Sequence, residues 1–255
     1  MRKIFITFLF ASLLTISGCS AATFKSVSSE QKKIVPVKLH IVSVGDSLTE
    51  GIGDSKNRGG YTYYLKHELN SLKGVKDTSI QNFGVKGNTT DQLLAKLQES
   101  AVKKAIKQSD LVIITIGGND IMKVFRANIS DLNEQAFKNA IPDYKKHLSN
   151  VFTTIRKENP NAKIALVGIY NPFSTWFSDI KEMNTILNDW NNTSKQVTKS
   201  YKNTTFIPVA DIFAKREDEL LYEEDHFHPN NKGYDLMSQR IFQYLLKDDF
   251  LRIPH

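Results

Sequence analysis

Short apolar runs rich in β-branched residues alternate with longer stretches of helical period along the chain from Val37 onward. This alternation is typical of a parallel sheet that is covered by helices. The run at 111–116 (LVIITI) is almost continuously apolar, which favours a strand that is buried on both faces. The pattern predicts strands at 39–44, 79–83, 111–116, 164–169 and 205–209.

Helices are expected between these strands, and each has a polar or small residue near its start. Asn159 and Pro160 should end the third helix, because proline cannot continue a helix. The composition after residue 37 does not change in a way that would indicate a second domain. We therefore predict one α/β domain at 38–255 with about five parallel strands. The predicted helices are 60–73, 89–108, 133–158, 178–200 and 231–247.

The first eighteen residues have a different pattern. Arg2 and Lys3 precede a mostly apolar run at 4–16, which is followed by small residues. The run is shorter than the roughly 20 residues that span a bilayer. We therefore predict that residues 1–18 are a secretory signal peptide that is removed, and not a permanent transmembrane helix.

Cys19 is the only cysteine, so no internal disulfide is possible. The segment Ile16-Ser17-Gly18-Cys19 resembles the cleavage box of bacterial lipoproteins, and this resemblance implies a diacylglycerol on Cys19. Two acyl chains are enough for stable anchoring. The expectation is a protein held on the extracytoplasmic side of the cell membrane, with residues 19–37 as a flexible tether. The alternative is a chance thiol at the end of a signal peptide.

The composition is that of an ordinary globular protein, since 40% of the 255 residues are hydrophobic and 24% are charged. This excludes the disordered and fibrous classes. The net charge is +7, but the lysines are scattered and do not cluster with aromatic residues. Nucleic-acid binding therefore has little support, and we expect a monomer that acts on a small-molecule or lipid substrate.

Chemistry is expected just after the strands, because ligands of open parallel sheets bind beyond the carboxyl ends of the strands. Each such segment has an ordinary reading as a turn or a helix cap when it is taken alone. Together they would place polar groups on one rim of the sheet. The four segments are GDSL at 45–48, NFGVKGNTT at 82–90, GGND at 117–120 and DHFHP at 225–229.

These segments contain every group that acyl transfer requires. A serine hydroxyl needs a neighbouring base to become a nucleophile, and we predict Ser47 as the nucleophile and His228 as the base. Asp225, three residues before His228, is placed to orient the imidazole. The backbone N–H groups of Ser47 and Gly87 and the side-chain amide of Asn119 are candidate donors for an oxyanion hole.

The order and type of these residues resemble the SGNH/GDSL hydrolase family over residues 38–247. The resemblance implies a flavodoxin-like, three-layer α/β/α fold, hydrolysis of carboxylic esters without metal or cofactor, and the roles given above. The chain has no Gly-x-Ser-x-Gly segment, and its candidate Asp and His share one short segment, unlike α/β-hydrolases.

His226 departs from the family pattern, in which many relatives have a small residue at this position. Asp225 and His228 keep the family spacing, so we retain His228 as the base and expect His226 at the surface or rim. An alternative is that Asp225, His226 and His228 bind zinc. No third histidine or acidic motif completes such a site, so no metal is predicted.

Substrate contacts are expected from the long segments at 121–135 and 170–183. Their apolar residues, which include Met122, provide an acyl pocket or a lid, or, alternatively, the aromatic ones only pack the loops onto the sheet. The candidates are Phe125, Phe173, Trp176 and Phe177. The sequence thus predicts an esterase or lipase of lipid or short-acyl esters at the cell envelope. Two alternatives stay open: an O-acetylesterase of cell-wall carbohydrate and a non-catalytic, envelope-binding lipoprotein.

Overall fold

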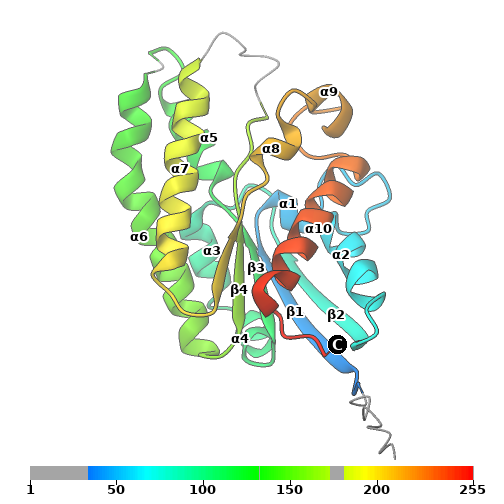
Figure 1. Cartoon of the computed structure of the whole chain (residues 1–255). Helices are drawn as coiled ribbons and strands as arrows, with labels where there is room; N and C mark the ends of the chain where they lie inside the picture. Colours follow the sequence, from blue (N-terminus) through cyan, green and yellow to red (C-terminus); the bar gives the residue numbers. More distant parts are fainter. Residues whose placement is uncertain (1–33, 132, 173–180, 255) are drawn as a thin grey trace, which may run out of the picture. The chain divides into compact units, whose positions relative to one another are not determined.

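A computed structural model describes residues 34–131, 133–172 and 181–254 (Figure 1). Their centre is a five-stranded sheet in the order β2-β1-β3-β4-β5, and every neighbouring pair of strands is parallel. The strands are β1 (Val37–Gly45), β2 (Val75–Gly84), β3 (Leu111–Thr115), β4 (Lys163–Val167) and β5 (Thr204–Ile207).

Helices cover both faces of this sheet (Figure 1). The helices after β1 and β2 are α1 (Ser47–Glu50), α2 (Tyr61–Asn70), α3 (Thr90–Lys96) and α4 (Ser100–Lys107). Those after β3 and β4 are α5 (Gly118–Ala127), α6 (Glu134–Glu158) and α7 (Lys181–Lys199). The chain continues after β5 with α8 (Ala210–Phe213), α9 (Glu217–Leu220), α10 (Asn231–Leu246) and the 3₁₀ helix η1 (Lys247–Asp249).

The sheet separates two hydrophobic cores. Successive side chains of a strand point to opposite faces, so β3 sends Val112 and Ile114 into one core and Leu111 and Ile113 into the other. The first core packs against helices that include α6 and α7, and the second packs against helices that include α2 and α10. The predicted three-layer α/β/α fold with five parallel strands is therefore confirmed.

All five predicted strands are present with shifted ends, and the third predicted helix ends at Glu158, just before Asn159 and Pro160. The helix predicted at 89–108 is wrong in extent, because a turn at 97–99 divides it into α3 and α4. The segment expected as a loop from residue 121 is helical up to Ala127.

The predicted signal peptide and Cys19 lie outside the described residues. Within the described ranges, no helix is long and apolar enough to cross a lipid bilayer.

Candidate active site

Ser47 lies in a tight turn between β1 and α1. Gly45 begins the turn at φ +144°, and a Cβ on it would lie 1.9 Å from the carbonyl oxygen of Thr115, so only glycine fits. The N–H of Asp46 then donates to the same carbonyl at 3.0 Å. The carboxylate of Asp46 caps α1 by accepting from the N–H of Leu48 at 3.1 Å. Ser47 is thereby fixed as the first residue of α1, at the carboxyl end of β1.

A chain of hydrogen bonds joins Ser47, His228 and Asp225. Nε2 of His228 lies 2.9 Å from Oγ of Ser47, and Nδ1 lies 2.6 Å from Oδ2 of Asp225. An ionised Asp225 only accepts, so Nδ1 carries the proton and Nε2 is left to accept from the serine hydroxyl. The structure thus brings together the three residues that the sequence singled out as nucleophile, base and orienting acid.

Asp225 is held as a carboxylate by its surroundings. Burial raises the pKa of Asp225, but hydrogen bonds from the His228 ring and from the backbone N–H groups of His228 and Phe227 outweigh it and hold the pKa below the usual range. The two backbone N–H groups donate to Oδ1 at 3.0 and 2.9 Å. Oδ2 is therefore left for the imidazole, and the local turn aligns acid and base.

One local and one long-range hydrogen bond hold the histidine segment in place. The carbonyl of His228 accepts from the N–H of Tyr222 at 2.7 Å. The hydroxyl of Tyr170, three residues after the end of β4, donates to the carbonyl of Phe227 at 2.6 Å. The Phe227 ring meets the His228 ring edge-on at a centroid distance of 5.0 Å. These contacts hold the backbone at Phe227 and His228 and one face of the His228 ring, and so restrain the position of the imidazole.

His226 lies on a different surface from Ser47. It lines a polar groove with Tyr222 and Asn231, and its backbone has a left-handed φ of +47°. Both ring nitrogens of His228 are already engaged by Ser47 and Asp225. Across the described ranges, no group of three histidine, cysteine or acidic side chains is arranged to hold a metal ion. The geometry therefore gives the zinc alternative no support.

Ser47 and Asn119, two of the predicted oxyanion donors, line the same cavity. The first N–H groups of a helix have no carbonyl one turn earlier to pair with, so the N–H of Ser47 is available to a ligand. Asn119 lies in the first turn of α5, and its Nδ2 donates to the carbonyl of Asn88 at 3.0 Å. One amide hydrogen of Asn119 remains for an oxyanion.

Gly87, the third candidate donor, is exposed beside Asn88 and has a φ of +85°. Apart from Gly87 itself and its two chain neighbours, no heavy atom lies within 4 Å of the position that a Cβ would occupy, so the space beside this glycine is open. Gly87 does not line the cavity in which Ser47 and Asn119 lie. Of the three predicted donors, Gly87 is therefore the one that this structure places outside the cavity.

Two polar contacts that the sequence did not reveal support this rim. The N–H and hydroxyl of Thr90 donate to the carboxylate of Asp120 at 3.0 and 2.6 Å. Burial raises the pKa of Asp120 despite these bonds. The contact ties the start of α3 to the first turn of α5, and so ties the segment of Gly87 to Asn119.

The second contact lies beneath Ser47. Oγ1 of Thr115 donates to Asp46 at 2.8 Å and lies 2.8 Å from Oγ1 of Thr49, which lies 3.0 Å from the hydroxyl of Tyr61. Burial raises the pKa of Asp46 to about 7. Asp46 belongs to the GDSL segment, but its burial depends on β3 and α2, which are distant in sequence.

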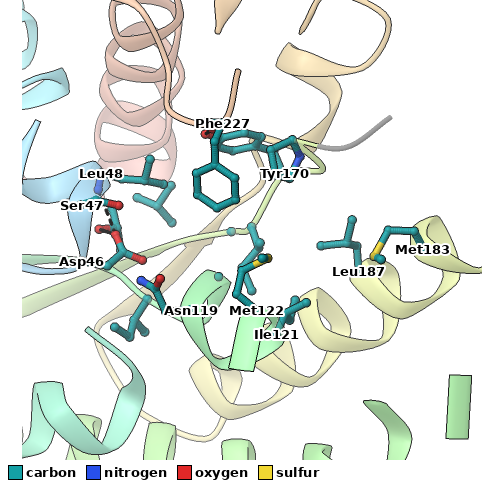
Figure 2. Close-up of a pocket in the computed structure, with 17 residues that line it drawn as sticks. Asp46, Ser47, Leu48, Asn119, Ile121, Met122, Tyr170, Met183, Leu187 and Phe227 are labelled. Atoms are coloured by element: carbon teal, nitrogen blue, oxygen red, sulfur yellow. Dashed lines mark hydrogen bonds between the residues drawn. The ribbon is translucent and has the colours of Figure 1, made fainter. Parts of the chain in front are cut away.

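An apolar cavity opens beside Ser47, across the carboxyl ends of β3 and β4 (Figure 2). The sequence placed Phe125 at the substrate, but Phe125 is buried in the core one helical turn beyond Ile121. Met122, from the same predicted segment, does line the cavity, and so does Ile121. The other expected contacts, Phe173, Trp176 and Phe177, lie outside the described residues. The further apolar lining residues include Leu48, Ile116, Ile169, Tyr170, Pro172, Met183, Leu187 and Phe227.

Comparison with known proteins places this geometry in context. The model of the GDSL-like lipase/acylhydrolase family matches residues 43–236. An uncharacterized protein of Bacillus subtilis, YpmR, is 37% identical over 96% of this chain and 98% of its own length. The spore germination lipase LipC of Bacillus licheniformis is 27% identical over 80% of this chain and 94% of its own length.

Among solved structures, the lipase Lip_vut3 from a goat rumen metagenome has a TM-score of 0.71 and 26% identity. The match covers 80% of this chain and 95% of that lipase.

Proposed function

Because the chain belongs to the GDSL-like lipase/acylhydrolase family and is a carboxylic ester hydrolase, we propose that Ser47, His228 and Asp225 carry out its catalysis. The observation that supports this proposal most directly is the unbroken hydrogen-bond chain from Ser47 Oγ through His228 to Asp225. The same chain argues against a protein that kept the fold only for binding, because a binding surface has no need of an oriented base.

The reaction follows from the positions of these groups. Oγ of Ser47 attacks the ester carbonyl carbon while Nε2 of His228 takes the hydroxyl proton. The tetrahedral intermediate collapses, the C–O bond to the alcohol breaks, and His228 returns the proton to the leaving alcohol. Water then attacks the acyl-Ser47 ester while Nε2 of His228 takes its proton. The bond between the acyl carbon and Oγ of Ser47 breaks, His228 returns the proton to Oγ, and the carboxylic acid is released. Asp225 stabilises the imidazolium in both steps.

The developing negative charge on the carbonyl oxygen needs donors in place before reaction. The proposed donors are the N–H of Ser47, the N–H of Gly87 and Nδ2 of Asn119. For Ser47 and Asn119, support comes from their shared cavity. For Gly87, support comes from its place directly before Asn88, whose carbonyl orients the Asn119 amide.

A fluorophosphonate probe tests this mechanism in the full-length chain, purified in mild detergent. A reactive serine displaces fluoride from the probe, and peptide mapping should locate the adduct on Ser47. Ser47→Ala should abolish labelling, whereas Ser55→Ala, a change of the same size in the polar groove, should retain it. An adduct on another serine, or no adduct in a protein with a native circular dichroism spectrum, would contradict the mechanism.

We further propose that the enzyme acts at the cell envelope, attached through a lipid on Cys19. The support is the sequence alone: a basic start, an apolar run and the segment Ile16-Ser17-Gly18-Cys19. Cys19→Ala should release the protein from the membrane fraction and prevent incorporation of labelled palmitate, and Ser20→Ala should do neither. Palmitate incorporation into Cys19→Ala would refute this location.

A further inference from the structure

The cavity beside Ser47 is polar at one end and apolar at the other (Figure 2). Asp46, Ser47 and Asn119 lie together at the polar end. At the opposite end, Met183 and Leu187 project from α7 toward the cavity. A substrate whose carbonyl lies between Ser47 and Asn119 therefore directs one of its two substituents toward α7.

The strand order sets the distance that a substrate must cross from Ser47 to α7. The nucleophile follows β1, and the cavity crosses the ends of β3 and β4, the next two strands of the sheet. Two strand spacings of nearly 5 Å amount to about 10 Å. An acetyl group extends only about 1.5 Å, one C–C bond, beyond its carbonyl carbon. An acyl chain needs on the order of seven such bonds or more to cover the same distance.

The walls along this path offer contacts to hydrocarbon. Ile121 and Met122 of α5 line the cavity between its two ends, and Phe227 covers it beside His228. These side chains present no strong hydrogen-bonding group, so a sugar ring in this position would lose its water without replacement. A flexible, linear chain has no such cost.

Met183 and Leu187 close the far end. Their exposed fractions are only 2% and 6%, because both pack into the core between the sheet and α7. A chain that reaches them cannot extend further without displacing packed side chains, which costs free energy. The cavity is therefore limited in length, and its limit is a pair of residues one helical turn apart.

We propose that Met183 and Leu187 set the length of the acyl chain that this enzyme accepts, and that its substrates are esters of linear, medium-length acyl chains rather than acetyl esters. The inference rests on the proposed function, since it requires the acyl group to be bound next to Ser47. Each methylene that enters the cavity should raise kcat/KM about fourfold, until the chain meets α7.

The test measures kcat/KM of the full-length protein for p-nitrophenyl esters from acetate to palmitate, each below its micellar concentration. For the native protein, the ratio of octanoate to acetate should exceed about 10². Leu187→Trp shortens the cavity and should lower this ratio at least about tenfold. Met183→Ala and Leu187→Ala lengthen it and should move the preferred chain by about two carbons or more.

Ile186→Ala is the matched control. Ile186 is a buried neighbour on α7 that packs into the same core but does not line the cavity. Its truncation should leave the octanoate-to-acetate ratio within about twofold of the native value. Fluorophosphonate labelling of Ser47 verifies for each variant that the catalytic site is intact. If one of the three test variants misfolds and is not labelled, the other two still test the inference.

The outcomes separate the inference from the proposed function. If Ser47 is labelled but acetate is the preferred ester, or if the preferred length is the same in all α7 variants, the inference is wrong and the catalytic proposal stands. If no ester is hydrolysed and Ser47 is not labelled in folded protein, both are wrong.

Discussion

The side-chain amide of Asn119 donates to the main-chain carbonyl of Asn88 at 3.0 Å, and this bond determines where its second amide hydrogen can point. Asn88 is itself held, since its own Nδ2 lies 3.4 Å from the carbonyl of Gly45, the residue that begins the serine turn. The loop after β2, the first turn of α5 and the Ser47 turn are thus connected by side-chain amides. An oxyanion donor that is oriented before the substrate binds needs no reorganisation during the reaction.

Asn119→Ala should therefore lower kcat by about 10² to 10³ with little change in KM, because the lost hydrogen bond forms mainly in the transition state. Steady-state kinetics on one soluble ester measures both constants. Asn128→Ala, which removes an amide at the other end of α5, should leave kcat within about threefold. A rise in KM at constant kcat in Asn119→Ala would show that the amide binds substrate and transition state equally.

The two neighbouring histidines should differ by several orders of magnitude. His228→Ala removes the group that lies 2.9 Å from Ser47 Oγ and should lower kcat by about 10⁴ to 10⁶. His226→Ala changes a residue of the polar groove and should lower kcat less than about tenfold. Equal losses in the two variants would require a different base. Addition of excess chelator should leave the native activity intact, and its loss would revive the zinc alternative.

Asp225→Asn should lower kcat by about 10² to 10⁴, because a neutral amide neither fixes the imidazole tautomer nor stabilises the imidazolium. The pKa of Asp225 lies below the usual range, so the carboxylate is ionised throughout neutral and alkaline pH. Steady-state kinetics of both proteins on one soluble ester at pH 8 measures this loss. Glu224→Gln, which removes the adjacent negative charge, is the matched control and should be close to native.

Asp46 should make stability depend on pH. Its pKa is raised from 3.8 to about 7 by burial, so the folded state keeps a proton that the unfolded state loses in this interval. The stabilisation from the protonated form is complete below about pH 4 and is lost as the pH rises through 7. A shift of about three pKa units corresponds to at most about 4 kcal/mol.

Asp46→Asn retains a side-chain oxygen acceptor for Leu48 and Thr115 but does not titrate. The free energy of unfolding of native protein, measured in urea, should fall relative to Asp46→Asn between pH 5 and pH 8. Parallel pH profiles for the two proteins would show that Asp46 is not protonated in the folded state at pH 5.

Two features of the site were readable from the sequence because they are local. The spacing of Asp225 and His228 lies within one turn, and their bond needs only that turn to form. Ser47 and Asn119 each follow an apolar run, and parallel strands bring such positions to one edge. Fold class and candidate site residues therefore follow from periodicity and from the position of polar residues after strands.

Other features depended on packing between segments that are distant in sequence. The GGND segment has the composition of a turn, yet it begins α5, because Ile121 and Phe125 at helical spacing are buried against the core. Which face of α5 meets the cavity was not encoded locally, so Phe125 was assigned to the substrate together with Met122, although of these α5 residues only Met122 and the unassigned Ile121 line the cavity. The same applies to Met183 and Leu187, whose role depends on where α7 crosses the sheet.

The sequence by itself determined the sheet, the order of its polar segments and the residue types available for acyl transfer. Only the tertiary structure decided the distance between Ser47 and His228, 181 residues apart, the burial that raises the pKa of Asp46, and the apolar path toward α7. The reason is physical. Periodicity indicates which side of a helix or strand faces the core, but the distances between side chains, their desolvation and the cavities between them arise from contacts between elements.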